Sequence, residues 1–108
     1  MDNCLFCKII KKEIPANVIF ENDQILIFED INPQAKKHLL AIPKKHYKDY
    51  LDFSRADEFE GFFSEVADFA KELGDFRLVS NCGERSGQTV FHVHFHLLSD
   101  EKLGSFGR

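Results

Sequence analysis

The feature that most constrains this fold is a strict alternation of residue types in positions 91–97. Histidines alternate there with apolar residues, in the order Phe91-His92-Val93-His94-Phe95-His96-Leu97, followed by Leu98. Successive side chains of a β-strand point to opposite faces, so a period of two predicts a strand. One face would join a core and the other would carry chemistry. The expected core face holds Phe91, Val93, Phe95 and Leu97.

A second pattern predicts one long helix. Apolar residues recur at helical spacing from Phe59 to Leu73. Ser54, followed three residues later by Asp57, fits a capping box at the helix start, and Gly74 stands where a C-terminal cap belongs.

Short apolar runs separated by turn residues make up most of the remaining chain. Residues 6–12 have weak helical character, which we expect Ile14-Pro15 to end, because the residue before a proline disfavours helical geometry. Asn22-Asp23 predicts a hairpin turn. Strands are expected over residues 17–21, 24–29, 38–42, 76–80 and 89–98. This order predicts an α+β fold, with a five-stranded antiparallel sheet, one long helix and a short N-terminal helix.

Length and composition limit the classes of protein. A chain of 108 residues without repeats or a flexible linker predicts one domain over residues 1–108. A net charge of -4 argues against a nucleic-acid partner. The apolar runs are far shorter than the ~18 residues that span a bilayer, which argues against a membrane partner. The N-terminus lacks the charged start and apolar stretch of a secretory signal, so we expect a cytoplasmic protein.

Three alternating histidines suggest a metal site or nucleophilic catalysis rather than a surface that merely tolerates imidazoles. Across a strand the first and last Cα atoms would lie ~13 Å apart, so two histidines could share an ion but three would need a bulge. Neutral imidazole attacks phosphorus well, and a histidine pKa near ~6.5 leaves it largely unprotonated at neutral pH. Nucleophilic catalysis is therefore favoured, and a metal site stays open.

The loop before the histidines has residues suited to binding phosphate. Gly87 lets backbone approach a ligand, and Asn81, Gln88 and Thr89 can donate hydrogen bonds to phosphate oxygens. A glycine-containing hairpin loop without a ligand has the same composition, so the prediction depends on the histidines that follow.

The cysteines predict half of a metal site. Three cysteines, an odd number, suit a disulfide framework poorly. Cys4 and Cys7 have the spacing that lets two thiolates bind one tetrahedral ion. A redox pair would need a strand before it, and only three residues precede Cys4. A buried pair without metal stays an alternative, and Cys82 is expected to be a free thiol.

Residues 92–98 match at every position the pattern His-φ-His-φ-His-φ-φ, in which φ is apolar. The chain thereby resembles the histidine-triad (HIT) superfamily of nucleotide hydrolases and transferases. It is most similar to the small histidine-triad nucleotide-binding proteins of the bacterial, zinc-containing type. Further parts of the chain that carry the resemblance are residues 6–10, 13–16, 28–35, 38–46 and 81–91.

The resemblance implies a HIT-like fold and an enzyme. The implied activity is hydrolysis of purine nucleoside 5′-phosphoramidates through a nucleotidyl-histidine intermediate, with AMP- or GMP-type nucleotides as ligands. A dinucleoside polyphosphate hydrolase and a non-catalytic nucleotide-binding regulator are the alternatives. The family usually forms a homodimer through its helix and fourth strand, which would here be residues 76–80.

The resemblance also assigns roles to residues. His94 would be the nucleophile, with the proton on its Nδ1 held, we expect, by a backbone carbonyl. His96 would bind phosphoryl oxygens, His38 would support the cluster, and Asp30 would bind the ribose hydroxyls. Gln88 and Thr89 would contact the phosphate and leaving group, and Asn81 would lie in the pocket, where Gly87 is also expected to be close to the nucleotide. The residues implied in an apolar wall for the base are Phe6, Ile9, Phe28 and Ile31.

By the same resemblance, His46 and His92 would complete the metal site with Cys4 and Cys7. The resemblance implies one structural zinc ion per chain. Close relatives often end in a Trp-Pro-Pro-Gly segment near the leaving group, whereas this chain contains no tryptophan.

Overall fold

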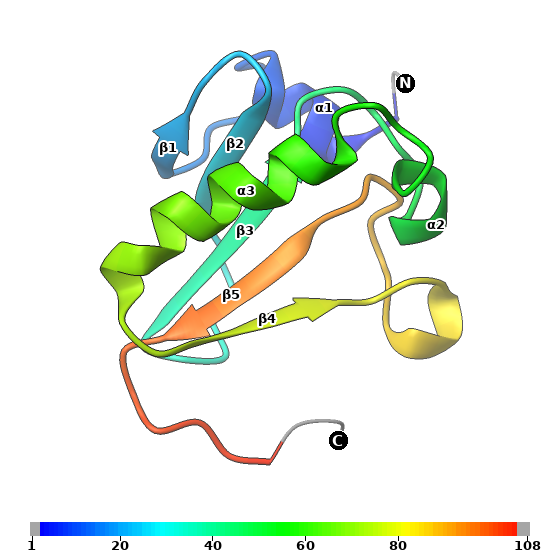
Figure 1. The fold of residues 1–108 in the computed structure, drawn as a ribbon. Coiled ribbons are helices and arrows are strands. Elements are labelled where there is room, and N and C mark those ends of the chain that lie inside the picture. Colours follow the sequence, from blue (N-terminus) through cyan, green and yellow to red (C-terminus); the bar gives the residue numbers. More distant parts are fainter. Residues whose placement is uncertain (1–2, 106–108) are drawn as a thin grey trace.

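The computed structural model describes residues 3–105 and has at its centre a five-stranded antiparallel sheet (Figure 1). The α+β fold class predicted from the sequence is confirmed. The strands, in spatial order, are β1 (Val18–Glu21), β2 (Ile25–Glu29), β3 (Lys37–Pro43), β5 (Phe95–Ser99) and β4 (Phe76–Ser80). The central position of β3 beside β5 brings the loop after one strand next to the segment that enters the other.

Helices lie on both faces of the sheet. The short helix α1 (Leu5–Ile10) covers one face, while the long helix α3 (Phe59–Ala70) crosses the other (Figure 1). A small helix α2 (Tyr50–Phe53) precedes α3, and 3-10 turns occupy Lys71–Leu73 and Glu84–Ser86. Within residues 3–105 no helix has the length and apolarity needed to cross a membrane.

The alternation of β2 and β3 gives the sheet two separate apolar clusters. Even-numbered Leu26 and Phe28 join the cluster under α1, whereas Ile25 and Ile27 join the cluster under α3. Phe53, Phe62, Phe95 and Leu97 complete much of the second cluster. Because α1 has only six residues, the first face keeps room beside the helix for a site.

The start predicted for the long helix is wrong. It begins at Phe59, and its N-cap, Glu58, makes no side-chain capping bond. Ser54 instead follows α2, where its hydroxyl donates to the carbonyl of Leu51 (2.7 Å). Asp49 caps α2 by accepting from the backbone N–H of Asp52, so Ser54 is at the C-terminal end of a separate short helix rather than at the start of the long one. Gly74 caps the 3-10 turn that follows α3, and its φ of 74° is positive as a left-handed cap requires, but its ψ of -130° places it outside the left-handed helical conformation that was expected.

The helix and turn near the N-terminus differ in part from expectation. α1 ends at Ile10, and the chain reverses at Lys12, which has a φ of 66°, before Pro15 can act. The proline is therefore not what ends the helix. The hairpin turn is confirmed, since the Asn22 side chain accepts from the backbone N–H groups of Gln24 and Ile25.

The last strand is shorter than predicted. It begins at Phe95 rather than Thr89, because the preceding segment bonds to the loop after β3 instead of to a strand. The backbone N–H of Val93 donates to the carbonyl of Tyr47 (2.7 Å). Val93, Phe95 and Leu97 still face the core, but Phe91 is 44% exposed and the core prediction for it is wrong. Two of the three histidines therefore lie outside the sheet, where the chain can direct them differently.

Candidate functional site

The three alternating histidines separate into two groups. His92 is fully buried and faces two cysteines, whereas His94 and His96 line a cavity of about 450 Å³ on the α1 side of the sheet. This division is possible because the segment before β5 bends away from the sheet. His92 therefore belongs to a group of side chains that could hold a metal ion, whereas His94 and His96 belong to the cavity.

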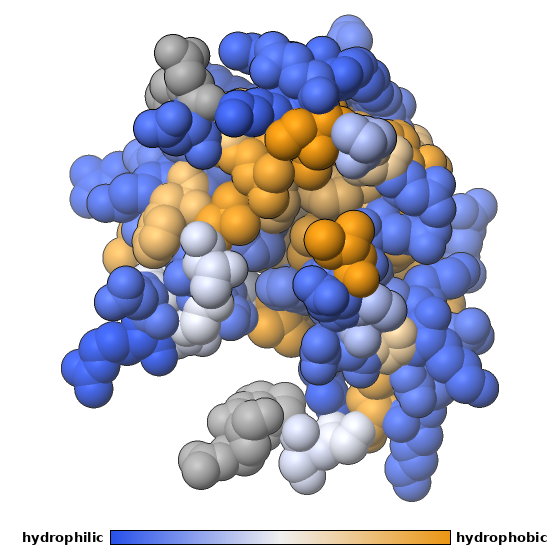
Figure 2. All heavy atoms as spheres, turned by 180° about the vertical axis from the view of Figure 1, so that it is seen from behind, coloured by the Kyte–Doolittle hydropathy of each residue, from blue (hydrophilic) through white to orange (hydrophobic). Residues whose placement is uncertain are grey.

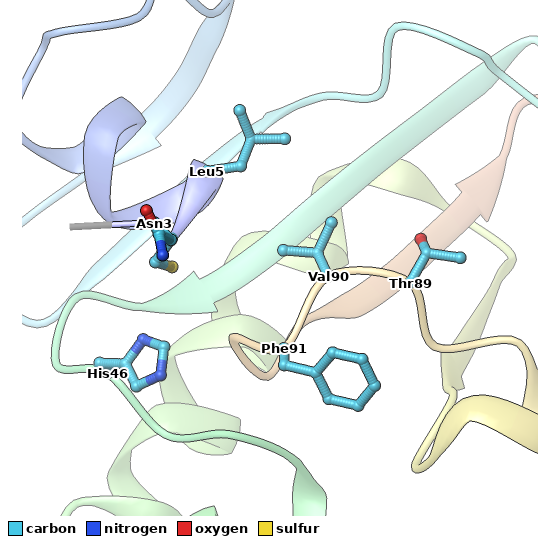
Figure 3. A pocket seen from close by; sticks show the side chains of 7 residues that line it. Asn3, Leu5, His46, Thr89, Val90 and Phe91 are labelled. Carbon is cyan, nitrogen blue, oxygen red and sulfur yellow. The ribbon is translucent and has the colours of Figure 1, made fainter. Parts of the chain in front are cut away.

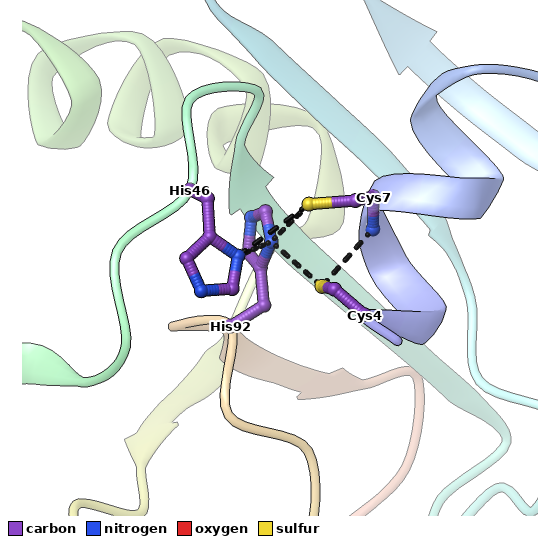
Figure 4. Close-up of side chains that lie close together, drawn as sticks. All are labelled: Cys4, Cys7, His46 and His92. Carbon is purple, nitrogen blue, oxygen red and sulfur yellow. Dashed lines mark hydrogen bonds between the residues drawn. The ribbon is translucent and has the colours of Figure 1, made fainter. Parts of the chain in front are cut away.

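Four side chains form a group with the geometry of a metal site (Figure 4). His92 Nδ1 lies 3.4 Å from Cys4 Sγ, 3.5 Å from Cys7 Sγ and 3.2 Å from His46 Nδ1. Cys7 Sγ lies 3.4 Å from His46 Nδ1. Ligand atoms arranged tetrahedrally around zinc at ordinary bond lengths would be roughly 3.3 to 3.8 Å apart. The four residues therefore fit one tetrahedral ion, and the predicted ligands are brought together.

Local structure sets each ligand in place. Cys4 is the N-cap of α1 and Cys7 lies one turn later, so both sulfurs point the same way (Figure 4). The backbone N–H of Cys7 donates to Cys4 Sγ (3.2 Å), which stabilises a thiolate. His92 Nε2 lies 2.8 Å from the carbonyl oxygen of Pro43 and must donate to it. That bond places the proton on Nε2 and leaves Nδ1 unprotonated for a metal.

Burial favours the neutral forms of these ligands. It raises the pKa of Cys7 to about 11, an effect that Cys4 increases, and it lowers the pKa of His92 to about 4. Neutral imidazole is the form that binds metal, whereas a buried thiolate needs the positive charge of a bound ion.

The hydrogen bond of His94 fixes its tautomer and leaves the Nε2 atom unprotonated. Its Nδ1 lies 2.9 Å from the backbone carbonyl oxygen of His92 and donates to it, which confirms the predicted backbone partner. The lone pair is therefore on Nε2, and the His94 side chain lines the cavity. Burial lowers the pKa of His94, so the imidazole stays neutral at neutral pH. A neutral imidazole with a fixed tautomer is a nucleophile.

His38 and His96 form a second oriented pair. The backbone N–H of Gln34 donates to His38 Nδ1 (2.9 Å), so the proton of His38 is on Nε2, 2.8 Å from His96 Nδ1. His96 accepts there and carries its own proton on Nε2. Burial and the neighbouring imidazoles lower the pKa of His96 to about 4, which keeps this pair neutral. His96 thus offers a hydrogen-bond donor without a net charge.

Asp30 lies at the edge of this pair. Its Oδ2 is 3.4 Å from His38 Nε2, and its Oδ1 accepts from the backbone N–H of Asn32 (2.8 Å). Both carboxylate oxygens are thereby oriented, and Asp30 also lines the cavity. Three potential metal ligand atoms, one each from Asp30, His38 and His96, lie within 4.8 Å of one another. The ring nitrogens of His38 and His96 already share a hydrogen bond, however, so they are not both available to a metal.

Apolar side chains form one wall of the cavity. Figure 2 shows apolar atoms gathered on this face and bordered by hydrophilic side chains. The Phe6 ring packs edge-on against Phe28 and against His94, with centroids 5.6 and 5.0 Å away. Ile9 lies beside them, and Ile31 stands at the rim with 91% of its surface exposed. The four residues predicted for the base wall therefore all line the cavity.

Several apolar residues of this wall were missed from the sequence. Among them are Ile14, Pro15 and Ala16, which follow α1 and line the same cavity. They belong to a segment that carries the family resemblance, and that was the available signal. Taken alone, they are indistinguishable from the residues that end a helix.

Hydrogen bonds from side chains to backbone groups hold the loop before β5 in its conformation. Buried Gln88 accepts from the backbone N–H of Gly83 (2.8 Å) and donates to the carbonyl of Lys48 (2.9 Å). Asn81 donates to the carbonyl of Ser86, and a Cβ atom at Gly87 would lie 2.8 Å from Asn81 Nδ2. Thr89 lines the cavity, whereas Asn81 bonds within its own loop and Gln88 joins this loop to Lys48 in the loop after β3. Phosphate contacts by Asn81, Gly87 and Gln88 stay predictions.

Fold and site together have the form of a histidine-triad protein, and comparison with known proteins agrees. The sequence profile of the HIT domain matches residues 11–103, so the chain belongs to the HIT family. A HIT-like protein of Rickettsia prowazekii is 51% identical over 92% of this chain and 88% of its own length. The protein HitA of Neisseria gonorrhoeae is 43% identical over 91% of this chain and 96% of its own.

Solved structures give the same result. A histidine triad protein from Clostridium difficile superimposes with a TM-score of 0.89 at 38% identity, covering 99% of this chain and 98% of its own. A HIT family hydrolase from Legionella pneumophila superimposes with a TM-score of 0.86 at 42% identity, covering 94% and 96%. Membership of the HIT superfamily and the HIT-like fold, both expected from the sequence, are confirmed.

Proposed function

We propose that this protein is a hydrolase that cleaves purine nucleoside 5′-phosphoramidates through a nucleotidyl intermediate on His94. The observation that carries the proposal is the tautomer of His94, whose Nδ1 proton is held by the His92 carbonyl so that the Nε2 lone pair is available in the cavity. The apolar wall suits a purine and Asp30 suits ribose hydroxyls. Similar structures from Legionella pneumophila and Clostridium thermocellum are described as HIT family hydrolases.

The reaction would take two steps. In the first, the His94 Nε2 lone pair attacks phosphorus, the P–N bond to the leaving amine breaks, and the amine nitrogen keeps the electron pair and takes a proton from water. In the second, water attacks phosphorus, loses a proton to solvent, and the P–N bond to His94 breaks to release the nucleoside monophosphate. His96 would donate from Nε2 to a phosphoryl oxygen, and Thr89 would contact the phosphate. His38 is a positioning residue, because it acts through His96.

Product analysis tests the activity against the two alternatives. Purified protein is incubated with adenosine 5′-phosphoramidate or with a diadenosine polyphosphate, and released AMP is quantified. A phosphoramidate hydrolase releases AMP and ammonia mainly from the first substrate. A dinucleoside polyphosphate hydrolase prefers the second, and a non-catalytic regulator binds AMP without turning over either.

Asp30→Asn is expected to weaken the binding of AMP more than that of its 2′,3′-dideoxy analogue. A carboxylate that accepts from both ribose hydroxyls loses that interaction only in ligands that have the hydroxyls, and the loss should be about tenfold in Kd. Calorimetric titration of both ligands with both proteins measures the difference. Equal weakening of the two ligands would remove Asp30 from the ribose site.

We also propose that the ion held by Cys4, Cys7, His46 and His92 is one structural zinc per chain. Two thiolates and two imidazoles in tetrahedral arrangement are typical ligands of zinc, and four protein ligands leave no open position for water. When bound, the ion would join α1 to the loop after β3 and to the segment before β5.

A homodimer that pairs two β4 strands is a further expectation. β4 lies at the edge of the sheet, and Phe76 and Leu78 on it are each 43% exposed. An exposed strand edge with apolar side chains invites pairing, and a two-fold axis there would join two sheets into one. Sedimentation equilibrium at micromolar concentration should give twice the chain mass. A species of 12.5 kDa would argue against the dimer.

A further inference from the structure

A second cavity, whose lining side chains are shown in Figure 3, adjoins the first cavity, which His94 and His96 line. It has a volume of about 630 Å³ and, like the first, is bordered by Leu5, Thr89 and Val90. Phe91 lines the second cavity but not the first, and His94 lines the first but not the second. The two spaces therefore meet at Thr89 and Val90, between the proposed nucleophile and Phe91.

Among residues 3–105, the second cavity is lined by apolar and by uncharged polar side chains, without lysine, arginine, aspartate or glutamate. Leu5 on α1 and Val90 and Phe91 before β5 supply its apolar surface. Asn3, Cys4, His46 and Thr89 complete the lining, and no described lining residue carries a charge once Cys4 and His46 are bound to a metal. Phe91 is 44% exposed, so its ring is available to a ligand. A site without lysine or arginine does not favour a phosphate, whereas an aromatic ring attracts another apolar or aromatic group.

We infer, on the basis of the proposed function, that the second cavity binds the leaving group, and that Phe91 determines its specificity for amines with an apolar or aromatic substituent. A nucleotide whose base lies against Phe6 and whose phosphorus lies at His94 fills the first cavity. The group attached to that phosphorus then enters the adjoining space past Thr89. A polyphosphate leaving group would carry several negative charges into a site without a cation, so this cavity selects an amine over a nucleotide.

The test uses two substrates with the same AMP half. Adenosine 5′-phosphoramidate releases ammonia and reaches no further than Thr89, whereas its N-(2-phenylethyl) derivative carries a phenyl ring into the second cavity. The ratio of kcat/KM for the derivative to kcat/KM for the parent is measured in the wild type and in Phe91→Ala. We expect this ratio to fall about tenfold in the variant, with kcat/KM for the parent nearly unchanged.

Two further variants sharpen the experiment. Leu51→Ala removes a 64% exposed apolar side chain in α2 that lines neither cavity, and the ratio should stay at the wild-type value. Phe91→Lys keeps a long side chain and adds a cation, so it should lower the ratio and raise activity toward a diadenosine polyphosphate relative to the wild type.

The outcomes separate the two claims. If the wild type hydrolyses the parent phosphoramidate but Phe91→Ala and Phe91→Lys leave the ratio unchanged, the leaving-group assignment is overturned and the proposed function stands. If the wild type hydrolyses neither phosphoramidate, the proposed function fails, and the leaving-group assignment fails with it.

Discussion

Replacement of His94 by alanine should abolish the hydrolysis of adenosine 5′-phosphoramidate while the affinity for AMP stays within about tenfold of the wild type. The reason is that different side chains of one cavity serve catalysis and binding. The His94 imidazole supplies the attacking lone pair, whereas binding rests on the wall around Phe6 and Phe28 and on Asp30. Removal of a covalent nucleophile eliminates the intermediate rather than slowing its formation modestly.

Turnover and AMP affinity are measured on the same preparation, so the binding measurement shows that the cavity is intact. His94 packs against Phe6, and a small loss of affinity through that contact is compatible with the account. Substantial turnover by a variant free of wild-type enzyme would remove His94 from the nucleophilic role.

Cys7→Ser should lower zinc content and thermal stability together. The four ligand side chains come from three segments that are distant in sequence. Loss of one ligand should therefore release α1 from the loop after β3 and from the segment before β5. Binding of a structural metal contributes directly to folding free energy, and we expect the melting temperature to fall by about 10 °C or more. Turnover should fall less than in His94→Ala, because the His92 carbonyl that orients His94 is displaced only indirectly.

The third cysteine provides the matched control. Cys82 lies in the loop after β4, outside the four-ligand group, so Cys82→Ser should keep both zinc and stability. Metal analysis of protein purified without chelator gives the direct measurement. Protein with no zinc, or zinc retained after serine replaces both Cys4 and Cys7, would falsify this ligand set.

The sequence predicted the fold well because most elements are determined by local patterns. The periods of two and of 3.6 located the sheet and α3 and assigned Phe95 and Leu97 to the core. Phe91 was misplaced because a period of two identifies extended backbone without showing whether a neighbouring strand pairs with it. The bond from Val93 to Tyr47, which takes the segment out of the sheet, joins residues that no local pattern relates.

The sequence predicted which residues form the site better than it predicted the hydrogen bonds between them. Spacing predicted Cys4 and Cys7 as half of a metal site, the family resemblance added His46 and His92, and the structure brings the four together. The contact between His38 and His96 joins residues 58 positions apart, and the tautomers follow only from their hydrogen bonds. Gln88 shows the converse, because both ends of an amide suited to phosphate are already bonded to backbone groups, the oxygen to Gly83 and the nitrogen to Lys48.

The central claim, that a nucleotide is carried on His94, is tested most directly by mass spectrometry of the enzyme during turnover. Protein mixed with adenosine 5′-phosphoramidate is quenched in alkali within milliseconds to seconds, digested, and searched for AMP bound to a peptide. We expect an adenylylated histidine at His94 that forms before AMP is released and is absent from the His94→Ala variant. Release of AMP with no nucleotide adduct at any quench time, or an adduct on a residue other than His94, would contradict it.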